Sequence, residues 1–138
     1  MVDYEKVIRE IWQDLQIVHE PDRLELARKL ETRTKNFAIS IIRLSTDLPK
    51  TEEGRVIKNQ LTKSGTSIGA NYREANRSRS KADFKSRIKI CESEASETNY
   101  WLEIIYELKL IKLGGNDTLL NECRELLAIF TSISRSLR

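Results

Sequence analysis

The sequence predicts an all-α protein, an up-down-up-down four-helix bundle with an additional N-terminal helix. Apolar residues recur at helical spacing in every piece of the chain, and no stretch has the convincing alternation of a strand. Only 5 glycines and 2 prolines occur in 138 residues, which argues against a turn-rich β fold. Charged residues make up 33% of the chain against 39% hydrophobic residues, a balance that long, charge-covered helices around a thin core would give.

The length and composition also bound the class of protein. A chain of 138 residues fits one domain of ordinary size. It contains no run of 18 apolar residues, so we expect no membrane span. The first residues lack the basic and apolar regions of a secretory signal, and 2 cysteines are too few for a disulfide framework. We therefore expect a cytoplasmic protein.

The first 20 residues form a separate amphipathic segment. Its apolar residues share one helical stripe. They are Tyr4, Val7, Ile8, Ile11, Trp12, Leu15 and Val18. Pro21 separates this segment from the rest of the chain. We predict an N-terminal helical extension at residues 1–20 and a four-helix bundle domain at residues 21–138.

Local signals mark where the bundle helices begin and end. Residues 22–25 and 80–83 have the spacing of capping boxes, and Thr51 is a suitable N-cap. Pro49 is expected to end the first bundle helix, and Gly114-Gly115 to close the third.

The core positions of the four helices follow spacings of three and four. The predicted core residues are Leu30, Thr34, Phe37, Ile41, Leu44, Leu48, Ile57, Leu61, Ser64, Ile68, Tyr72, Ala75, Phe84, Ile88, Cys91, Ala95, Thr98, Leu102, Ile105, Leu119, Cys123, Leu126, Phe130, Ile133 and Leu137. Gly65 and Gly69 lie beside this seam, one turn apart. Since glycine inside a helix costs about 1 kcal/mol relative to alanine, we expect a neighbour to approach them closely.

The helix that follows Ser80 carries a second semi-apolar stripe, roughly 110° around the helix from its core seam. This stripe consists of Ile90, Glu94, Glu97, Trp101, Ile104 and Leu108. A helix with two such stripes needs two partners, and the second is either the N-terminal helix or another subunit. Together with Gly65 and Gly69, the stripe is our predicted oligomer interface.

The sequence offers no constellation for catalysis. The single histidine, His19, excludes sites that need two imidazoles, and no phosphate-binding loop or nucleophile elbow is present. Cys91 and Cys123 both lie on core seams, where a thiol behaves as a small hydrophobe. We therefore predict no catalytic residue, no metal and no cofactor, and we expect the protein not to be an enzyme.

Positive charge is concentrated around the turn between the second and third bundle helices. Residues 55–89 hold ten basic and two acidic residues, a net charge of +8. The predicted nucleic-acid-binding residues are Arg73, Arg77, Arg79, Lys81, Lys85, Arg87 and Lys89. Such side chains can displace counterions from a phosphate backbone, and Asn76, Ser78 and Ser80 would add neutral donors. Pairing with the acidic stretch 90–107 of another subunit, or plain solvation, are the alternatives for this charge.

Two motifs resemble a known family. They are the stretch Ser-Gly-Thr-Ser-Ile-Gly-Ala-Asn-Tyr-Arg-Glu-Ala at residues 64–75 and Arg-Ser-Arg-Ser-Lys-Ala-Asp-Phe at residues 77–84. Both resemble the bacterial four-helix bundle protein family, also called the 23S rRNA intervening-sequence proteins, over residues 24–137. The resemblance implies a bundle that assembles into a ring, a pentamer in members of known fold. Relatives include accessory variability proteins of diversity-generating retroelements, which bind a reverse transcriptase and nucleic acid.

These observations lead to one hypothesis about function and one alternative. The first is a non-enzymatic, homo-oligomeric bundle that binds RNA or DNA, or a nucleic-acid enzyme such as a reverse transcriptase, through the basic residues. The alternative is a protein–protein interaction scaffold that does not touch nucleic acid. Neither hypothesis involves a membrane.

Overall fold

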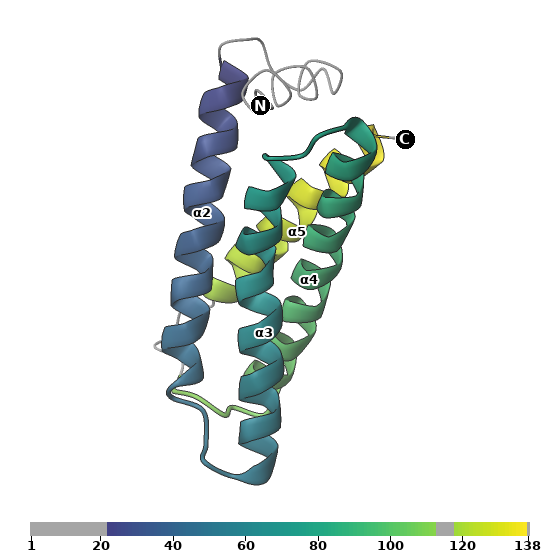
Figure 1. The fold of residues 1–138 in the computed structure, drawn as a ribbon. Coiled ribbons are helices and arrows are strands. Elements are labelled where there is room, and N and C mark those ends of the chain that lie inside the picture. Colours follow the sequence, from purple (N-terminus) through teal and green to yellow (C-terminus); the bar gives the residue numbers. More distant parts are fainter. Residues whose placement is uncertain (1–21, 113–117, 138) are drawn as a thin grey trace.

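The computed structural model describes residues 22–112 and 118–137, and these residues form four α-helices and no strand. The helices are α2 (Asp22–Ser45), α3 (Glu52–Ala75), α4 (Lys81–Glu107) and α5 (Thr118–Ser136) (Figure 1). The predicted all-α four-helix bundle is therefore confirmed. The predicted helical extension at residues 1–20 lies outside the described residues. None of the four described helices is long and apolar enough to cross a membrane.

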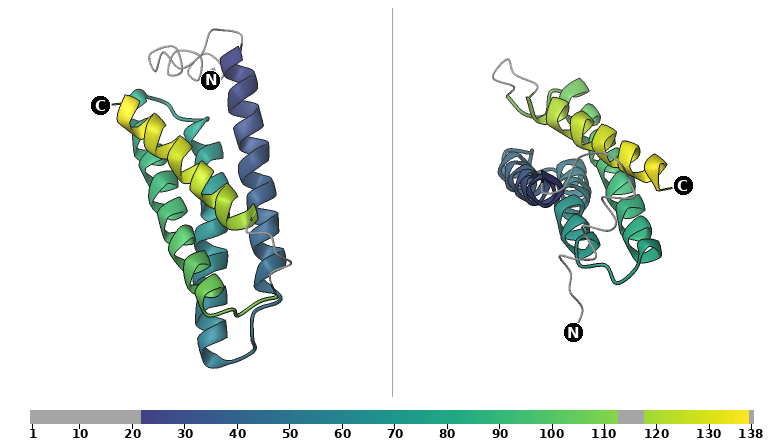
Figure 2. Two further views of the ribbon diagram at one scale, coloured as in Figure 1. Left: turned by 180° about the vertical axis from the view of Figure 1, so that it is seen from behind. Right: turned by 90° about the horizontal axis from the view of Figure 1, so that it is seen from above.

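The helices alternate in direction, and each packs chiefly against the next one in the chain. α3 packs against both α2 and α4, whereas α5 packs mainly on α4 and only lightly on α2. Figure 2 shows that α5 crosses the bundle obliquely, lying near α2 at its first residues and diverging from α2 toward its end. The α3–α4 turn, the beginning of α2 and the end of α5 all lie at one end of the bundle (Figure 1).

The core is formed by the seams that the sequence predicts. The seven predicted core residues of α4 are all fully buried, and so are most of those on the other helices. Three buried hydroxyls on these seams donate to carbonyl oxygens of their own helices: Thr34 to Leu30, Ser64 to Leu61 and Thr98 to Glu94. Their polar atoms are thus satisfied without leaving the core. The rings of Tyr72 and Phe130 meet edge to face at 5.5 Å and join α3 to α5.

Two of the three glycines of α3, Gly65 and Gly69, allow α2 to approach closely. A Cβ atom added to Gly65 would lie 2.8 Å from Cγ2 of Ile41, and one added to Gly69 would lie 3.1 Å from Oγ1 of Thr34. The close approach expected at these glycines is therefore made by α2 of the same chain. Both glycines are buried inside the bundle, so they are not available to an interface between subunits, and this part of the predicted interface is corrected.

Helix α4 ends before Gly114-Gly115, where the sequence predicts its end. α4 ends at Glu107, and Lys109 has a positive φ of 52°. The N–H groups of Lys109 and Leu110 donate to the carbonyls of Tyr106 and Ile105 at 3.2 and 3.1 Å. This is the Schellman pattern of helix termination, with a lysine where glycine is usual. Leu110 packs against the core and holds this conformation in place.

Replacing Lys109 with glycine is expected to stabilise the protein. A side chain in the left-handed region costs about 1 kcal/mol, which glycine does not incur. We expect the free energy of unfolding to rise by about 1 kcal/mol, or the melting temperature by about 3 °C. Urea and thermal unfolding followed by circular dichroism measure this. Lys112→Gly is the matched control, since Lys109 is the one non-glycine residue with positive φ among the described residues, and a gain in both variants would contradict the assignment.

Candidate nucleic-acid interface

The α3–α4 turn is a tight connection whose backbone groups bond within the turn itself. After Ala75, the N–H groups of Asn76, Arg77 and Ser78 donate to carbonyls of the last turn of α3 at 3.0–3.1 Å. Ser80 is the N-cap of α4, and its Oγ accepts from the N–H of Asp83 at 3.1 Å, as its capping motif predicts. The cap side chain thus satisfies one of the N–H groups at the start of α4.

The turn presents its basic side chains to solvent. Of the seven predicted nucleic-acid-binding residues, six are exposed and Arg87 is half-buried. Within the described residues, the guanidinium groups of Arg77 and Arg79 and the ammonium group of Lys85 make no ion pair. The nearby carboxylate of Asp83 instead accepts a hydrogen bond from the backbone N–H of Arg79 at 3.4 Å.

The other predicted nucleic-acid-binding residues lie on different sides of the bundle. Nε of Arg73 lies 3.7 Å from Oε1 of Glu31 on α2. Nη1 of Arg87 donates to Oδ1 of Asn71 on α3 at 3.3 Å. Lys89 lies 3.8 Å from Glu92, beside a hollow between α4 and α5. The predicted set therefore wraps around the end of the bundle. Its centre is Arg77, Arg79, Lys81 and Lys85, in the turn and the first part of α4, which we call the basic turn.

Two of the expected neutral donors are not available at this surface. Asn76 and Ser78 are 3% and 0% exposed, and Nδ2 of Asn76 donates to Oε2 of Glu31 at 3.1 Å. Ser80 is engaged as the helix cap. The expectation that these three residues donate to a phosphate backbone is wrong for Asn76 and Ser78, because the turn folds their side chains inward.

Two further residues belong to this end of the bundle and were not singled out from the sequence. Glu31 accepts a hydrogen bond from Asn76 and pairs with Arg73, and so it ties the end of α3 to α2. Arg135 is exposed in the last turn of α5, at the same end as the turn. The up-down topology could have placed Arg135 there, because the last helix of such a bundle ends beside the second turn.

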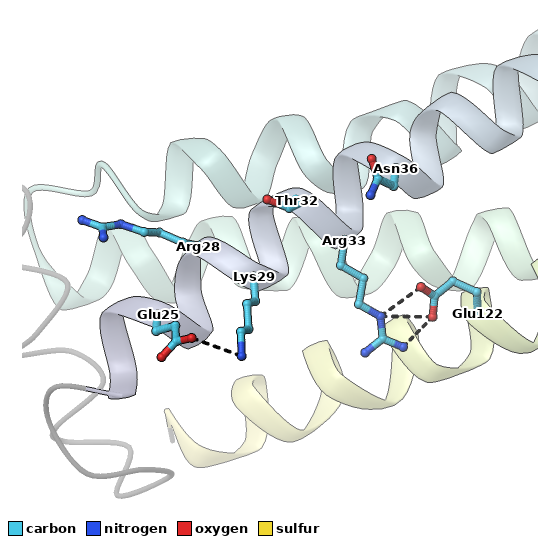
Figure 3. A pocket seen from close by; sticks show the side chains of 7 residues that line it. All are labelled: Glu25, Arg28, Lys29, Thr32, Arg33, Asn36 and Glu122. Atoms are coloured by element: carbon cyan, nitrogen blue, oxygen red, sulfur yellow. Dashed lines mark hydrogen bonds and ion pairs between the residues drawn. The ribbon is translucent and has the colours of Figure 1, made fainter.

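Two cations of α2 that lie beside α5 are compensated by nearby carboxylates. A polar pocket of about 470 Å³ lies on α2 beside α5 and contains Lys29 and Arg33 (Figure 3). Nε of Arg33 donates to both carboxylate oxygens of Glu122 at 2.9 and 3.1 Å, and Arg33 also pairs with Glu125. Lys29 lies 3.3 Å from Glu25. These pairs leave less positive charge for a phosphate here than at the basic turn.

The second stripe of α4 is partly open to solvent. Ile90 is 37% and Leu108 is 63% exposed, while Trp101 and Ile104 are half-buried. Glu97 is exposed and accepts from Nε1 of Trp101 at 3.4 Å. The pKa of Glu94 is raised, mainly because burial disfavours its charged form and secondly because of the negative charge of Glu97. The stripe is an apolar row beside carboxylates, a surface that suits another protein surface better than it suits a phosphate backbone.

The two cysteines are buried on the core seams. Sγ of Cys91 lies 3.5 Å from the carbonyl oxygen of Ile68, and Sγ of Cys123 lies 3.5 Å from that of Ala95. Burial raises the pKa of each thiol to about 12. Neither thiol is a nucleophile near neutral pH, since the thiolate is the reactive form. Among the described residues, which do not include His19, no cluster of three or more His, Cys, Asp or Glu side chains could hold a metal ion.

Comparison with known proteins identifies both a protein family and a similar solved structure. Residues 28–132 match the family described as 23S rRNA-intervening sequence protein. The chain is also similar to the crystal structure of a protein of unknown function from the S23 ribosomal protein family of Bacteroides thetaiotaomicron, with 33% sequence identity and a TM-score of 0.70. That similarity covers 79% of this chain and 97% of the other. No curated protein matches this chain.

Proposed function

The chain belongs to the 23S rRNA-intervening sequence protein family, and on that premise we propose that it is a non-enzymatic bundle that binds RNA or DNA through the basic turn. The observation that carries the proposal is the cluster of exposed cations at the basic turn, of which Arg77, Arg79 and Lys85 make no ion pair within the described residues. A phosphate backbone would supply a counter-charge and release its own condensed cations. Phosphate contacts of this kind hold a nucleic acid without reading its sequence.

Assembly of several copies would strengthen this binding. We propose that the partly exposed stripe of α4, with Ile90, Trp101 and Leu108, packs against a second copy. A closed ring would then present one basic turn per subunit. Binding at several linked sites gives an avidity beyond the affinity of one site. A nucleic-acid enzyme such as a reverse transcriptase could be recruited on the same assembly.

The test is the salt dependence of binding. Purified protein, stripped of nucleic acid, is titrated against labelled mixed-sequence RNA and duplex DNA at several salt concentrations. We expect the triple variant Arg77→Ala/Arg79→Ala/Lys81→Ala to reduce the slope of log affinity against log salt on duplex DNA by about 2 to 3, because each lost phosphate contact removes about 0.9. Circular dichroism checks that the bundle stays folded, and light scattering on the same samples gives the number of subunits.

The matched control removes the same charge at the opposite end of the bundle. Lys50, Arg55 and Lys58 are exposed at the α2–α3 end. Their triple alanine variant should leave the slope nearly unchanged. Equal losses in both variants would mean that only net charge matters, and the basic turn would no longer be the site. Absence of binding near physiological salt would favour the protein-interaction scaffold, and a single subunit would remove the ring.

A further inference from the structure

An apolar groove lies between α2 and α5. It has a volume of about 610 Å³. Its lining residues are Leu26, Lys29, Leu30 and Arg33 from α2 and Ala128, Ile129, Ser132 and Ile133 from α5. Leu30 and Ile133 are buried, whereas Leu26 and Ile129 are half-buried and Ala128 is exposed. Apolar surface is thus left partly open along both helices.

The oblique course of α5 determines the shape of this groove. Arg33 joins α2 to the beginning of α5 through Glu122 and Glu125. From there α5 diverges from α2, so the two helices lie farther apart toward the beginning of α2 (Figure 2). The groove therefore opens at the end of the bundle where α2 starts.

We propose that the N-terminal segment of the same chain, residues 3–18, docks in this groove as a helix. The segment is joined to α2 at Asp22 through only three residues, 19–21. A connection of two to five residues is the length found in hairpins of antiparallel helices, so a helix at residues 3–18 can lie beside the first turns of α2. One side of α2 is already covered by α3, and the groove is the apolar surface left on the side toward α5.

The length and the apolar stripe of the segment fit this groove. A helix of 16 residues is about 24 Å long, enough to run along the groove from Leu26 to Arg33, which are separated by about 10 Å of helix. The apolar stripe of the N-terminal segment provides the face that would pack into the groove. The proposal is independent of nucleic-acid binding.

Trp12 reports on this docking in the full-length protein. Trp101→Phe leaves Trp12 as the single tryptophan, since the chain has two. We expect its emission at short wavelength, and a quenching constant with acrylamide roughly threefold lower than that of the unfolded chain, because a packed indole is shielded from water. In this background, Ile129→Asp should abolish the protection. Ile42→Asp is the matched control, since Ile42 is 47% exposed on α2 and does not line the groove.

Two more variants keep the test decisive. If Ile129→Asp fails to fold, Ala128→Glu places a charge at an exposed position in the same groove and should also release Trp12. A Leu15→Cys/Ile129→Cys pair should oxidise to a species of monomer mass on a non-reducing gel. Linked dimers would show that the segment docks on a second copy, and a Trp12 that is quenched as readily as in the unfolded chain would show that it does not dock. Either result overturns the proposal.

Discussion

Replacing Gly54 with alanine is expected to lower the free energy of unfolding by about 3 kcal/mol, the range of overpacked cores. Gly54 lies in the first turn of α3, where the chain from the α2–α3 turn folds back over it. A Cβ atom there would lie 1.9 Å from the carbonyl oxygen of Pro49 and 3.1 Å from Oγ1 of Thr51. The Pro49 oxygen belongs to the backbone, so the clash can be relieved only by moving the turn. Such a movement also disturbs the N-cap bond from the N–H of Gly54 to Oγ1 of Thr51.

The other two glycines of α3 provide a graded comparison. Alanine at Gly65 would meet the side chain of buried Ile41 at 2.8 Å, and alanine at Gly69 would meet Thr34 at 3.1 Å. Alanine also gains about 1 kcal/mol of helix propensity over glycine, which offsets part of each clash. Urea unfolding should therefore rank the losses as Gly54→Ala, then Gly65→Ala, then Gly69→Ala. A Gly54→Ala variant as stable as the wild type would contradict the geometry of the turn.

Alkaline pH is expected to destabilise the bundle through its two thiols. Burial raises the pKa of Cys91 and of Cys123 from 9.0 to about 12 in the folded state. Between pH 9 and 12 the unfolded chain has lost these protons while the folded chain keeps them. The free energy of unfolding is therefore highest below pH 9 and falls as pH rises, by about 1.4 kcal/mol per pH unit for each thiol. Two pH units above 9, the expected loss is several kcal/mol.

Urea unfolding at a series of pH values from 7 to 11 measures this slope. The control is the double variant Cys91→Ala/Cys123→Ala, which should be less stable at neutral pH but lose less stability per pH unit above 9. Burial also raises the pKa of Tyr72, and this contribution is retained in both proteins. Equal slopes in the two proteins would mean that the thiols ionise as readily in the folded chain as in the unfolded one.

The helices could be predicted because their signals are local. The seam from Phe84 to Ile105 repeats at spacings of three and four, and all its members are buried. Ser80 caps α4 as its sequence motif predicts. In contrast, the sequence predicts the end of α4 too far along the chain. The reason is that Lys109 adopts a backbone conformation that sequence rules assign to glycine. What stabilises that conformation is the packing of Leu110 on the core, which is a tertiary effect.

The candidate interface was predictable only in its charges. A cluster of basic residues on either side of a turn identifies a positive end of the bundle. The sequence does not show that Glu31, more than 40 residues away, pairs with Arg73 and draws Asn76 inward. Nor does it show that Gly65 faces Ile41 rather than another subunit. In each case the partner is distant in the chain, and only the packed bundle reveals it.

The sequential packing of the helices bears on how the chain reaches its native state. Because α2, α3, α4 and α5 each contact mainly the next helix, nearly all the tertiary contacts close short loops. Loop-closure entropy is small for such contacts, and proteins of low relative contact order fold quickly. The α3–α4 hairpin has the most extensive packing and is the natural nucleus, onto which α2 and then α5 would be added. A mutation confined to the α2–α5 contact would then change mainly the rate of unfolding.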